Sequence, residues 1–566
     1  MSDIRQTQER VGDGMVFDKD VPVPMSDGTV LRANVFRPVA EGRHPVVMAM
    51  GVYGKDVHFR DGFSAQWDRL REIYPGLDTD GSSGRFLRWE MVDPERWVPD
   101  GYVVVAVDSR GSGKSPGYLD PLSPVETRDY AEAIDWAGVQ AWSTGKVGLL
   151  GVSYLATKQW QVAALQPKHL AAIVPWEGAC DIYREWGRHG GIRTRFPVDW
   201  WPRQVGLNQH GVAETRYRDA DTGERSTGPA LPPGILAGNR SRHVAELLEH
   251  ELDDAWYGAM TPDFSRIEVP LLSAANWGGP GLHLRGNIEG WRAAASRDKW
   301  LSFHIGTHFE SFYLPAYIDL QKRFFERYLK GVDNGWERDQ PPIRMEVRTV
   351  DGSILRDEHE WPLARTDWQR WHLDPAAKTL AMDAPATASE ISFDAPGDGV
   401  DFATAPLTAD TEFTGPVALR LVAASSTADM DIFATLRLFD PDGNEKAFVG
   451  AHEDTPLTRG WLRASHRKLD PDRSEPWRPW HSHDELQKLT PGETVTLDIE
   501  IWPTSIVVPA GWRLVLTLAG RDFEHAAPGR MLHDDPADRP AEIFGGVTTV
   551  HGGVDGGSWL LLPKIP

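Results

Sequence analysis

Cysteine is almost absent from this sequence. Cys180 is the only one among 566 residues, so a disulfide bond within the chain is excluded and nothing indicates an oxidising compartment. Long apolar runs are missing too, since none approaches the ~18 residues that a membrane-spanning helix requires. The polar stretch 1–15 has no apolar centre of the kind that a signal peptide contains. These absences predict a soluble, cytoplasmic protein.

Basic residues are in the minority. The chain has 60 lysines and arginines against 82 aspartates and glutamates, a formal charge of −22, and no long basic run. A nucleic acid or an anionic membrane is therefore not an expected partner, and the acidic excess is typical of a soluble surface. Neither an H-E-x-x-H motif nor paired Cys/His spacing occurs, so we expect no catalytic metal and no cofactor.

The first third of the chain alternates between apolar runs and a helical pattern. Apolar runs at 30–37, 45–50, 101–107 and 170–175 predict strands, and 124–137 has the spacing and the acidic first turns of a helix. Strands that are apolar throughout indicate a sheet buried on both faces. The sequence thus predicts a mostly parallel α/β sheet.

The sequence pattern then changes twice. Residues 182–262 are rich in tryptophan and charge and predict a helical insertion, because strand patterns resume at 267–274 and 299–305. From 343 onward, short alternating runs separated by Pro, Gly and Asp turns predict an all-β jelly-roll domain. The predicted division is an α/β domain in two parts (1–181 and 263–342), a helical cap (182–262) and a jelly roll (343–566).

A serine stands where the apolar strand 146–152 runs directly into a helical pattern. A hydroxyl is a weak nucleophile, so it needs an exposed position that a histidine and an oxyanion hole both reach. A sharp strand-to-helix turn supplies that position and aims the N–H of Tyr154 into the site. Leu155 occupies the place of the second glycine of G-x-S-x-G, and Ala156 follows it. Ser153 is predicted as a nucleophile, with a buried serine at an ordinary strand end as the alternative.

The base is expected after the last strand of the α/β domain. Hydrolases with a serine elbow on such a sheet place the nucleophile, the acid and the histidine in that chain order. His308 follows the strand 299–305 in the loop Gly306-Thr307-His308, so it is the predicted base. His304 lies within the strand and is predicted as a core histidine.

Five segments together resemble the CocE/NonD acyl-hydrolase family. They occur in the family's order at 51–56, 108–115, 140–148, 151–160 and 460–465. The resemblance implies an α/β-hydrolase domain with an inserted helical cap, followed by a C-terminal jelly-roll domain. It also implies hydrolysis of a small-molecule ester or amide without a cofactor, and a homo-oligomer.

The same resemblance implies that the Tyr53 hydroxyl joins the Tyr154 N–H in the oxyanion hole. A tyrosine just after a core strand can donate one hydrogen bond to the developing oxyanion without adding a charge. A buried packing tyrosine is the alternative.

The acid of the triad is not where the family has it. Gly279 stands where relatives carry an aspartate, and the next carboxylate, Glu289, falls on the following predicted helix. Glu177 comes directly after the strand 170–175, where an acid can reach the same histidine from the neighbouring strand end. We predict that Glu177 is the acid. The alternative is a carboxylate that pairs with a cap arginine, Arg184 or Arg188.

The 24 tryptophans bear on the substrate. Trp176 and Trp277 follow strand ends beside the acid position, and they are predicted to line an apolar acyl or alcohol pocket, with cap tryptophans on the other wall. Packing between cap and core is the alternative for each of them.

The run Ser112-Gly113-Lys114-Ser115 resembles part of a phosphate-binding loop. Asp108 occupies the place of the first glycine of that motif, and a carboxylate there would repel phosphate. Nucleotide binding is therefore not expected.

These observations predict a serine hydrolase that cleaves a carboxylic ester, or an amide, through an acyl-enzyme on Ser153. Two alternatives stay open. One is an X-Pro dipeptidyl-peptidase or aminoacyl hydrolase, which needs cap carboxylates for the substrate ammonium. The other is a non-catalytic binding protein that has lost its triad acid.

Overall fold

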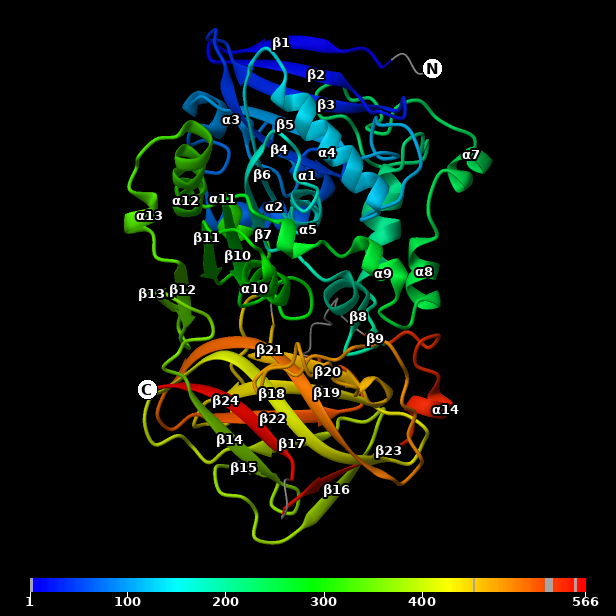
Figure 1. Cartoon of the computed structure of the whole chain (residues 1–566), viewed down its shortest axis with the longest axis vertical. Helices are drawn as coiled ribbons and strands as arrows, with labels where there is room; N and C mark the ends of the chain where they lie inside the picture. Colours follow the sequence, from blue (N-terminus) through cyan, green and yellow to red (C-terminus); the bar gives the residue numbers. More distant parts are fainter. Residues whose placement is uncertain (1–3, 451–453, 525–532, 554–556) are drawn as a thin grey trace.

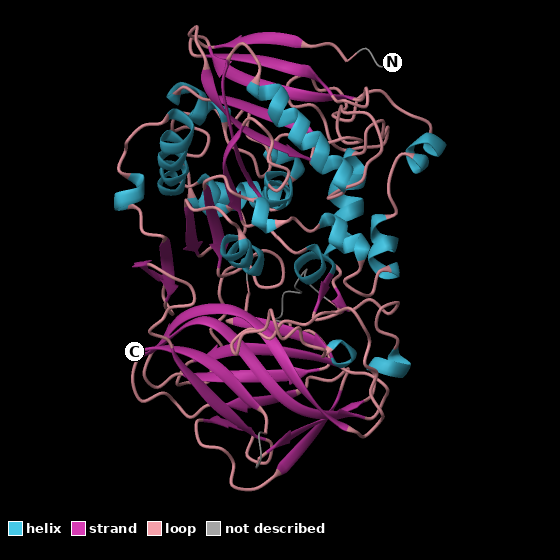
Figure 2. Cartoon of the chain, viewed as in Figure 1, coloured by secondary structure: helices cyan, strands magenta, loops and turns pink. Residues whose placement is uncertain are grey.

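The structure, a computed structural model, describes residues 4–450, 454–524, 533–553 and 557–566. It consists of an α/β part, at the top of Figure 1, and an all-β part below it. Figure 2 shows the helices concentrated in the first part and strands dominating the second. Within the described ranges no helix is long and apolar enough to cross a membrane.

An eleven-stranded sheet runs through the α/β part in the order β1-β2-β3-β5-β4-β6-β7-β10-β11-β12-β13. Neighbouring strands from β5 to β12 in this order are parallel, which confirms the predicted sheet. The strands are β1 (Thr7–Val11), β2 (Met15–Pro24), β3 (Val30–Pro38), β4 (His44–Gly51), β5 (Val103–Asp108), β6 (Ser143–Val152), β7 (Leu170–Trp176), β10 (Leu271–Asn276), β11 (Lys299–His304), β12 (Ile343–Arg348) and β13 (Ser353–Glu358).

Helices cover both faces of this sheet. Central strands such as β5 and β10 are therefore buried along their whole length. One face packs against Ile134 and Trp160, and the other against Phe324 and Leu329. The helices are α1 (Phe59–Gly62), α2 (Ser64–Ile73), α3 (Pro94–Trp97), η1 (Val98–Asp100), α4 (Pro124–Gly138), α5 (Tyr154–Ala163), α10 (Leu284–Ala293), α11 (Glu310–Tyr313), α12 (Pro315–Phe325), η6 (Glu326–Lys330) and α13 (Trp336–Asp339).

The insertion between β7 and β10 lies over the start of α5. Its Trp200 ring stacks on Tyr154 with centroids 5.8 Å apart, and Trp186 meets Trp200 edge to face at 5.0 Å. Most regular elements of the insertion are helices, but these are short, loops join them and a two-stranded ribbon interrupts them. Its elements are η2 (Ile182–Gly187), β8 (Arg188–His189), β9 (Ile192–Arg193), α6 (Phe196–Trp200), η3 (Trp201–Val205), η4 (Gly206–Asn208), α7 (Pro233–Gly238), α8 (His243–Glu249), α9 (Ala255–Met260) and η5 (Phe264–Arg266).

The second sheet also has eleven strands, and it closes on itself because β24 pairs with both β14 and β18. Its elements are β14 (Asp367–Asp374), β15 (Thr379–Ala381), β16 (Ser389–Asp394), β17 (Val400–Ala403), β18 (Thr411–Ser425), β19 (Asp431–Phe439), β20 (Thr458–Arg463), η7 (Ala464–His466), β21 (Thr494–Val508), β22 (Arg513–Ala519), α14 (Ala541–Phe544), β23 (Val547–Gly552) and β24 (Trp559–Ile565). This all-β domain is the predicted jelly roll.

The strands β12 and β13 belong to the first sheet, although the sequence places residues from 343 onward in the jelly roll. β12 lies parallel to β11, with Ile343 opposite Leu301, and β13 completes that edge. A short alternating run identifies a strand but not the sheet that it joins. The first sheet therefore extends to Glu358.

Candidate active site

Ser153 lies at a strained turn between β6 and α5. Its φ of 59° and ψ of −116° fall in a region that residues with side chains rarely adopt, at a cost of about 1–3 kcal/mol. Hydrogen bonds hold the turn: the Ser153 N–H donates to the carbonyls of Trp176 and Glu177, each at 3.0 Å, and the Ser153 carbonyl accepts from Ala156 and Thr157. The turn has the strained strand-to-helix geometry that the sequence predicts, and the role of Ser153 as nucleophile stays a prediction.

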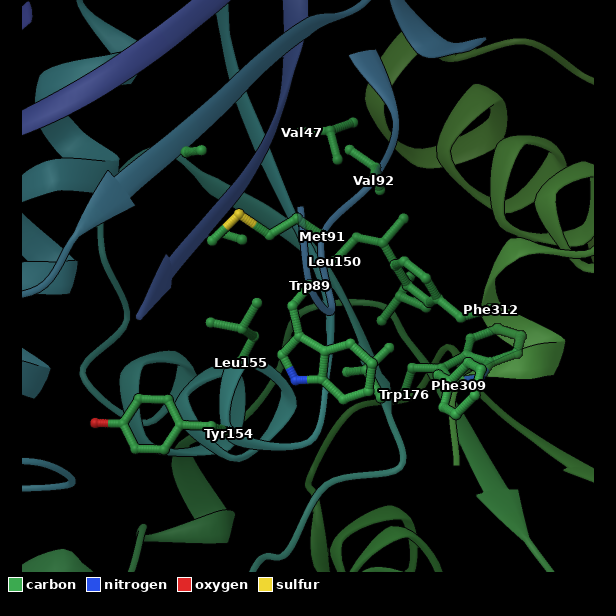
Figure 3. Close-up of a cluster of buried hydrophobic side chains, with 14 of the residues drawn as sticks. Val47, Trp89, Met91, Val92, Leu150, Tyr154, Leu155, Trp176, Phe309 and Phe312 are labelled. Carbon is green, nitrogen blue, oxygen red and sulfur yellow. The ribbon is translucent and has the colours of Figure 1, made fainter. Parts of the chain in front are cut away.

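The leucine in the place of the motif's second glycine is accommodated by glycines elsewhere. A Cβ added at Gly51 or Gly151 would clash with the side chain of Leu155, so both positions leave room for it. The close approach between α5 and the chain after β7 falls one residue later, where a Cβ at Gly178 would clash with Ala156. The departure from G-x-S-x-G therefore leaves the elbow intact. Figure 3 shows Leu155 among the buried side chains of the core.

Glu177 and His308 meet just beyond the carboxyl ends of β7 and β11. Glu177 Oε2 lies 2.9 Å from His308 Nδ1, and Oε1 lies 2.8 Å from His304 Nε2 and 3.2 Å from the Asn276 amide nitrogen. Burial raises the pKa of Glu177, but the charge of His308 and the hydrogen bonds from both histidines bring it below its usual value. The structure thus pairs an ionised carboxylate with the predicted base.

The cap arginines that were the alternative partners of Glu177 pair with other carboxylates. Arg184 forms ion pairs with two aspartates and Arg188 pairs with Asp538 of the jelly roll, and within the described ranges neither arginine pairs with Glu177. Glu289, the other candidate acid, lies on α10 and pairs with arginines there and in the jelly roll. The interpretation of Glu177 as the partner of a cap arginine is therefore wrong.

The hydroxyl of Ser153 faces a histidine that the sequence does not predict. Ser153 Oγ lies 3.0 Å from Nε2 of His283, a buried residue directly before α10. The rings of His283 and His308 stack with centroids 5.0 Å apart and 21° between their planes. His308 turns its own Nε2 toward Glu90, at 3.3 Å. The structure brings the predicted base to the predicted acid, but the hydroxyl of Ser153, the predicted nucleophile, hydrogen-bonds His283.

Two carboxyl groups hold the His308 ring, one at each nitrogen. Glu90 is buried, has a φ of 63°, and accepts the N–H of Val152, next to the nucleophile, through its carbonyl. Burial raises the pKa of the Glu90 carboxyl to about 7. Burial lowers the pKa of His308, but the charges and hydrogen bonds of Glu177 and Glu90 outweigh this and raise it to about 10. The two carboxyl groups therefore favour the protonated form of His308.

Tyr53 follows β4 and places its hydroxyl beside the elbow. The hydroxyl accepts a hydrogen bond from Trp200 Nε1 of the cap at 3.2 Å and also hydrogen-bonds Ser153. Burial raises the pKa of this phenol well above its usual value, so it stays neutral and able to donate. Tyr154 is the first residue of α5, where backbone N–H groups have no acceptor within the helix. Both positions fit the predicted oxyanion hole.

We expect Tyr53→Phe to lower kcat for an ester by about 10²–10³-fold with little change in KM, because one donor to the oxyanion is lost while the ring still packs. Steady-state kinetics check this. Tyr130→Phe is the matched control, since the Tyr130 hydroxyl bonds a carbonyl of β4 on the other side of the sheet. A wild-type kcat in Tyr53→Phe would exclude the tyrosine from the oxyanion hole.

Trp176 and Trp277 lie inside the core. Trp176 stacks on His304 and donates its N–H to Ser311 Oγ at 3.0 Å, while Trp277 stacks on Phe303 with ring centroids 4.3 Å apart. Both side chains are almost fully buried, and Figure 3 shows Trp176 among apolar neighbours. This packing matches the alternative interpretation, and a role in lining the substrate pocket stays a prediction.

The segment that resembles a phosphate-binding loop is part of a buried charge network. Asp108 accepts the backbone N–H groups of Lys55 and Lys114, and Lys114 Nζ pairs with Asp20 and Asp219. Three carboxylates of this network lie close enough to share a metal ion, but each forms an ion pair with a lysine. The network therefore links β-strands and loops by internal charge pairing.

Comparisons with known proteins identify the family. The model of the X-Pro dipeptidyl-peptidase (S15 family) matches residues 27–310, and the model of the X-Pro dipeptidyl-peptidase C-terminal non-catalytic domain matches residues 334–553. The chain belongs to the S15 family. It is 25% identical to cocaine esterase from Rhodococcus sp., over 96% of this chain and 98% of that protein. The resemblance predicted from the five segments is confirmed.

Solved structures agree with this assignment. A CocE/NonD family hydrolase from Staphylococcus aureus has a TM-score of 0.85 and 33% identity, covering 100% of this chain and 97% of that one. An aminopeptidase from a marine sediment Thaumarchaeota archaeon shares the fold, with a TM-score of 0.71 and 15% identity, covering 100% and 99%. The S15 chain described here is a serine acyl hydrolase with an α/β-hydrolase domain and a C-terminal jelly roll.

Two residues of the site are missing from the sequence prediction. His283 comes four residues after Gly279, and a histidine directly before the helix that follows a core strand is a usable signal for the functional edge of the sheet. Glu90 gives no comparable signal, because it follows no predicted strand. Its burial and its left-handed backbone become visible only in the folded chain.

Proposed function

We propose that this S15 hydrolase cleaves carboxylic esters through an acyl-enzyme on Ser153, with His308 as the general base and Glu177 as the acid of the triad. The observation that carries the proposal is the strained elbow, which presents Ser153 Oγ to a pair of stacked histidines. One of those histidines is bound to an ionised carboxylate.

His308 is the better base of the two histidines. A base must hold the proton taken from serine, and Glu177 stabilises the imidazolium while fixing the proton on Nδ1. His283 Nδ1 has no hydrogen-bond partner among the described residues, and burial with the charge of His308 keeps the pKa of His283 well below its usual value. Catalysis then requires His308 to give up the Nε2 proton of its protonated form, to Glu90 or to solvent, and to turn the unprotonated Nε2 to Ser153.

The reaction follows from these positions. Ser153 Oγ attacks the ester carbonyl while His308 takes its proton, and the Tyr53 hydroxyl and the Tyr154 N–H donate to the oxyanion. The imidazolium returns the proton to the departing alcohol oxygen, which leaves the acyl group on Ser153. Water attacks the acyl-enzyme by the same route, again with His308 as base, and releases the acid.

The surroundings of the serine favour an apolar ester over an aminoacyl or X-Pro substrate. Three rings lie against Tyr53, those of Phe63, Tyr154 and Trp200. A substrate ammonium requires a carboxylate that is free to bind it, whereas Glu90 and Glu177 both hydrogen-bond His308. Aromatic walls with few charges suit an apolar acyl or alcohol group.

Chemical labelling and a substrate panel test the proposal. We expect a fluorophosphonate probe to modify wild-type protein on the peptide that contains Ser153, as mass spectrometry of a digest can establish. We also expect p-nitrophenyl esters to be hydrolysed much faster than aminoacyl or X-Pro anilides. Absence of labelling would favour the binding-protein alternative, and faster cleavage of X-Pro anilides would favour the peptidase.

The second carboxyl group on His308 predicts a pH effect. We expect Glu90→Gln to move the acid limb of kcat/KM to lower pH by about 1–3 units. A base must be unprotonated, so activity rises with pH through the pKa of His308, and the negative charge of Glu90 raises that pKa. Removing this charge lets the base act at lower pH.

Profiles of kcat/KM against pH for the wild type and Glu90→Gln check this prediction. Glu95→Gln is a matched control from the same segment, because Glu95 hydrogen-bonds Ser83 away from the triad. An acid limb that stays in place or moves to higher pH in Glu90→Gln would contradict the assignment.

A further inference from the structure

We propose that His283 is a second catalytic histidine, which stays neutral and donates a hydrogen bond from Nε2 to the Ser153 oxygen while the His308–Glu177 pair carries the proton. This inference rests on the proposed function, because it assigns a role at the same serine. It adds a second histidine to the triad: His283 donates a hydrogen bond to the Ser153 oxygen, and His308 accepts the hydroxyl proton.

The contact between His283 and Ser153 is enclosed and held by the backbone. The two side chains meet at 3.0 Å, and the residues are 2% and 4% exposed. The loop that carries His283 is tied to the sheet, because the Trp277 N–H donates to the His304 carbonyl at 3.0 Å. The His283 N–H donates to the Gly279 carbonyl at 3.4 Å, which closes the turn into α10. The imidazole is therefore placed by regular elements on both sides.

The second nitrogen of His283 indicates its tautomer. Nδ1 is buried and has no hydrogen-bond partner among the residues that the structure describes. A proton on Nδ1 would leave a buried donor without an acceptor, which folded proteins rarely tolerate, whereas a proton on Nε2 leaves only a lone pair unfilled. With the proton on Nε2, His283 donates to Ser153 Oγ. The hydroxyl proton of Ser153 is then free to pass to another base.

Four features oppose a positive charge on His283. The ring is buried without a carboxylate partner, it stacks 5.0 Å from the His308 ring, and two carboxyl groups favour a positive charge on His308. His283 also directly precedes α10, and the aligned N–H groups at a helix N-terminus disfavour a cation. A second cation at this point would be repelled from both directions. His283 therefore suits a neutral donor and not the group that stores the proton.

A neutral donor at this position has a use during the reaction. It holds the Ser153 oxygen in place, so that the hydroxyl proton can point to His308 once the unprotonated Nε2 has turned from Glu90 to Ser153. As the proton leaves, negative charge develops on Oγ, and a preorganised N–H stabilises it without any rearrangement. His308 keeps the role of base and acid throughout.

Two variants separate a donor from a base. His283→Phe fills the space without a donor, and His283→Gln offers an amide N–H near the position of Nε2. We expect His283→Phe to lower kcat/KM for a p-nitrophenyl ester, and the rate of fluorophosphonate labelling, by about 10²–10³-fold. We expect His283→Gln to recover at least about tenfold of that loss. The acid limb of the pH profile should coincide in wild type and His283→Gln.

Each outcome decides the proposal. A His283→Gln variant as inactive as His283→Phe, or one that has lost the acid limb, would make His283 the base and overturn it. Wild-type rates in His283→Phe would also overturn it. His250→Gln is the matched control, since His250 lies in the cap and bonds Asp254. If thermal unfolding shows that the phenylalanine variant does not fold, the glutamine variant's pH profile still decides. Failure of the proposed function is distinguishable, because it shows as a wild-type protein without an adduct on Ser153.

Discussion

Ser153→Ala is expected to lower kcat for p-nitrophenyl ester hydrolysis by about 10⁶-fold and to abolish fluorophosphonate labelling. Alanine removes Oγ, the atom that forms the acyl-enzyme, and it keeps the Cβ that the elbow already accommodates at a φ of 59°. The backbone hydrogen bonds from the Ser153 N–H to two carbonyl groups are retained. The loss is therefore chemical and leaves the fold in place.

Kinetics, labelling and thermal unfolding of the same preparations check this result. Ser109→Ala is a close control, because Ser109 is also a buried serine just after a strand of this sheet and its hydroxyl has no hydrogen-bond partner among the described residues. We expect that variant to keep wild-type activity. Labelling that survives Ser153→Ala would refute the serine assignment, whatever the state of the histidines.

The elbow and the Glu177–His308 pair could be predicted because each follows from a local pattern. An apolar strand running into a helix defines the turn at Ser153, and Glu177 and His308 each come just after an apolar strand. Parallel strands carry their carboxyl ends to one edge of the sheet, so residues that follow such strands come together. This argument needs only the strand boundaries, which the apolar runs give well.

The contacts of His283 and Glu90 could not be predicted in the same way. Each depends on the path of a loop, and loop conformation is determined by packing against distant segments. The His283 loop is oriented by a bond to the His304 carbonyl, and Glu90 by its bond to Val152. The hydroxyl of Ser153 could equally have met His308 first, given the strand order alone. The alternating pattern of β12 and β13 fits either domain. The sheet that these two edge strands join could therefore not be predicted from the sequence either.

Glu177→Gln is expected to lower kcat by about 10⁴-fold while the protein stays folded. The carboxylate accepts from His308 at one oxygen and from His304 and Asn276 at the other. An amide of the same shape must point its NH₂ group at one of these donors, so either the orientation of His308 or the support from the strand is lost. The base then has the wrong tautomer, and its imidazolium loses a stabilising charge.

Glu289, the other candidate acid, supplies the control for this prediction. Glu289→Gln makes the same chemical change on α10, where the carboxylate pairs with arginines, and we expect kcat close to that of the wild type. Steady-state kinetics with one p-nitrophenyl ester, and thermal unfolding of both variants, complete the comparison. Activity close to wild type in Glu177→Gln would sink the assignment of the triad acid.

Both carboxyl groups that touch His308 raise its pKa, so the loss of either is expected to move the acid limb of kcat/KM to lower pH, and kcat is the quantity that separates their roles. Glu177 bonds Nδ1, the nitrogen that faces away from the reaction, so its loss acts on the chemical step and appears in kcat. Glu90 bonds Nε2, the nitrogen that must accept the Ser153 proton, so its loss frees the base and moves the acid limb of kcat/KM to lower pH. A Glu177→Gln variant that only moved the acid limb, with kcat retained, would mean that the two carboxylates exchange these roles.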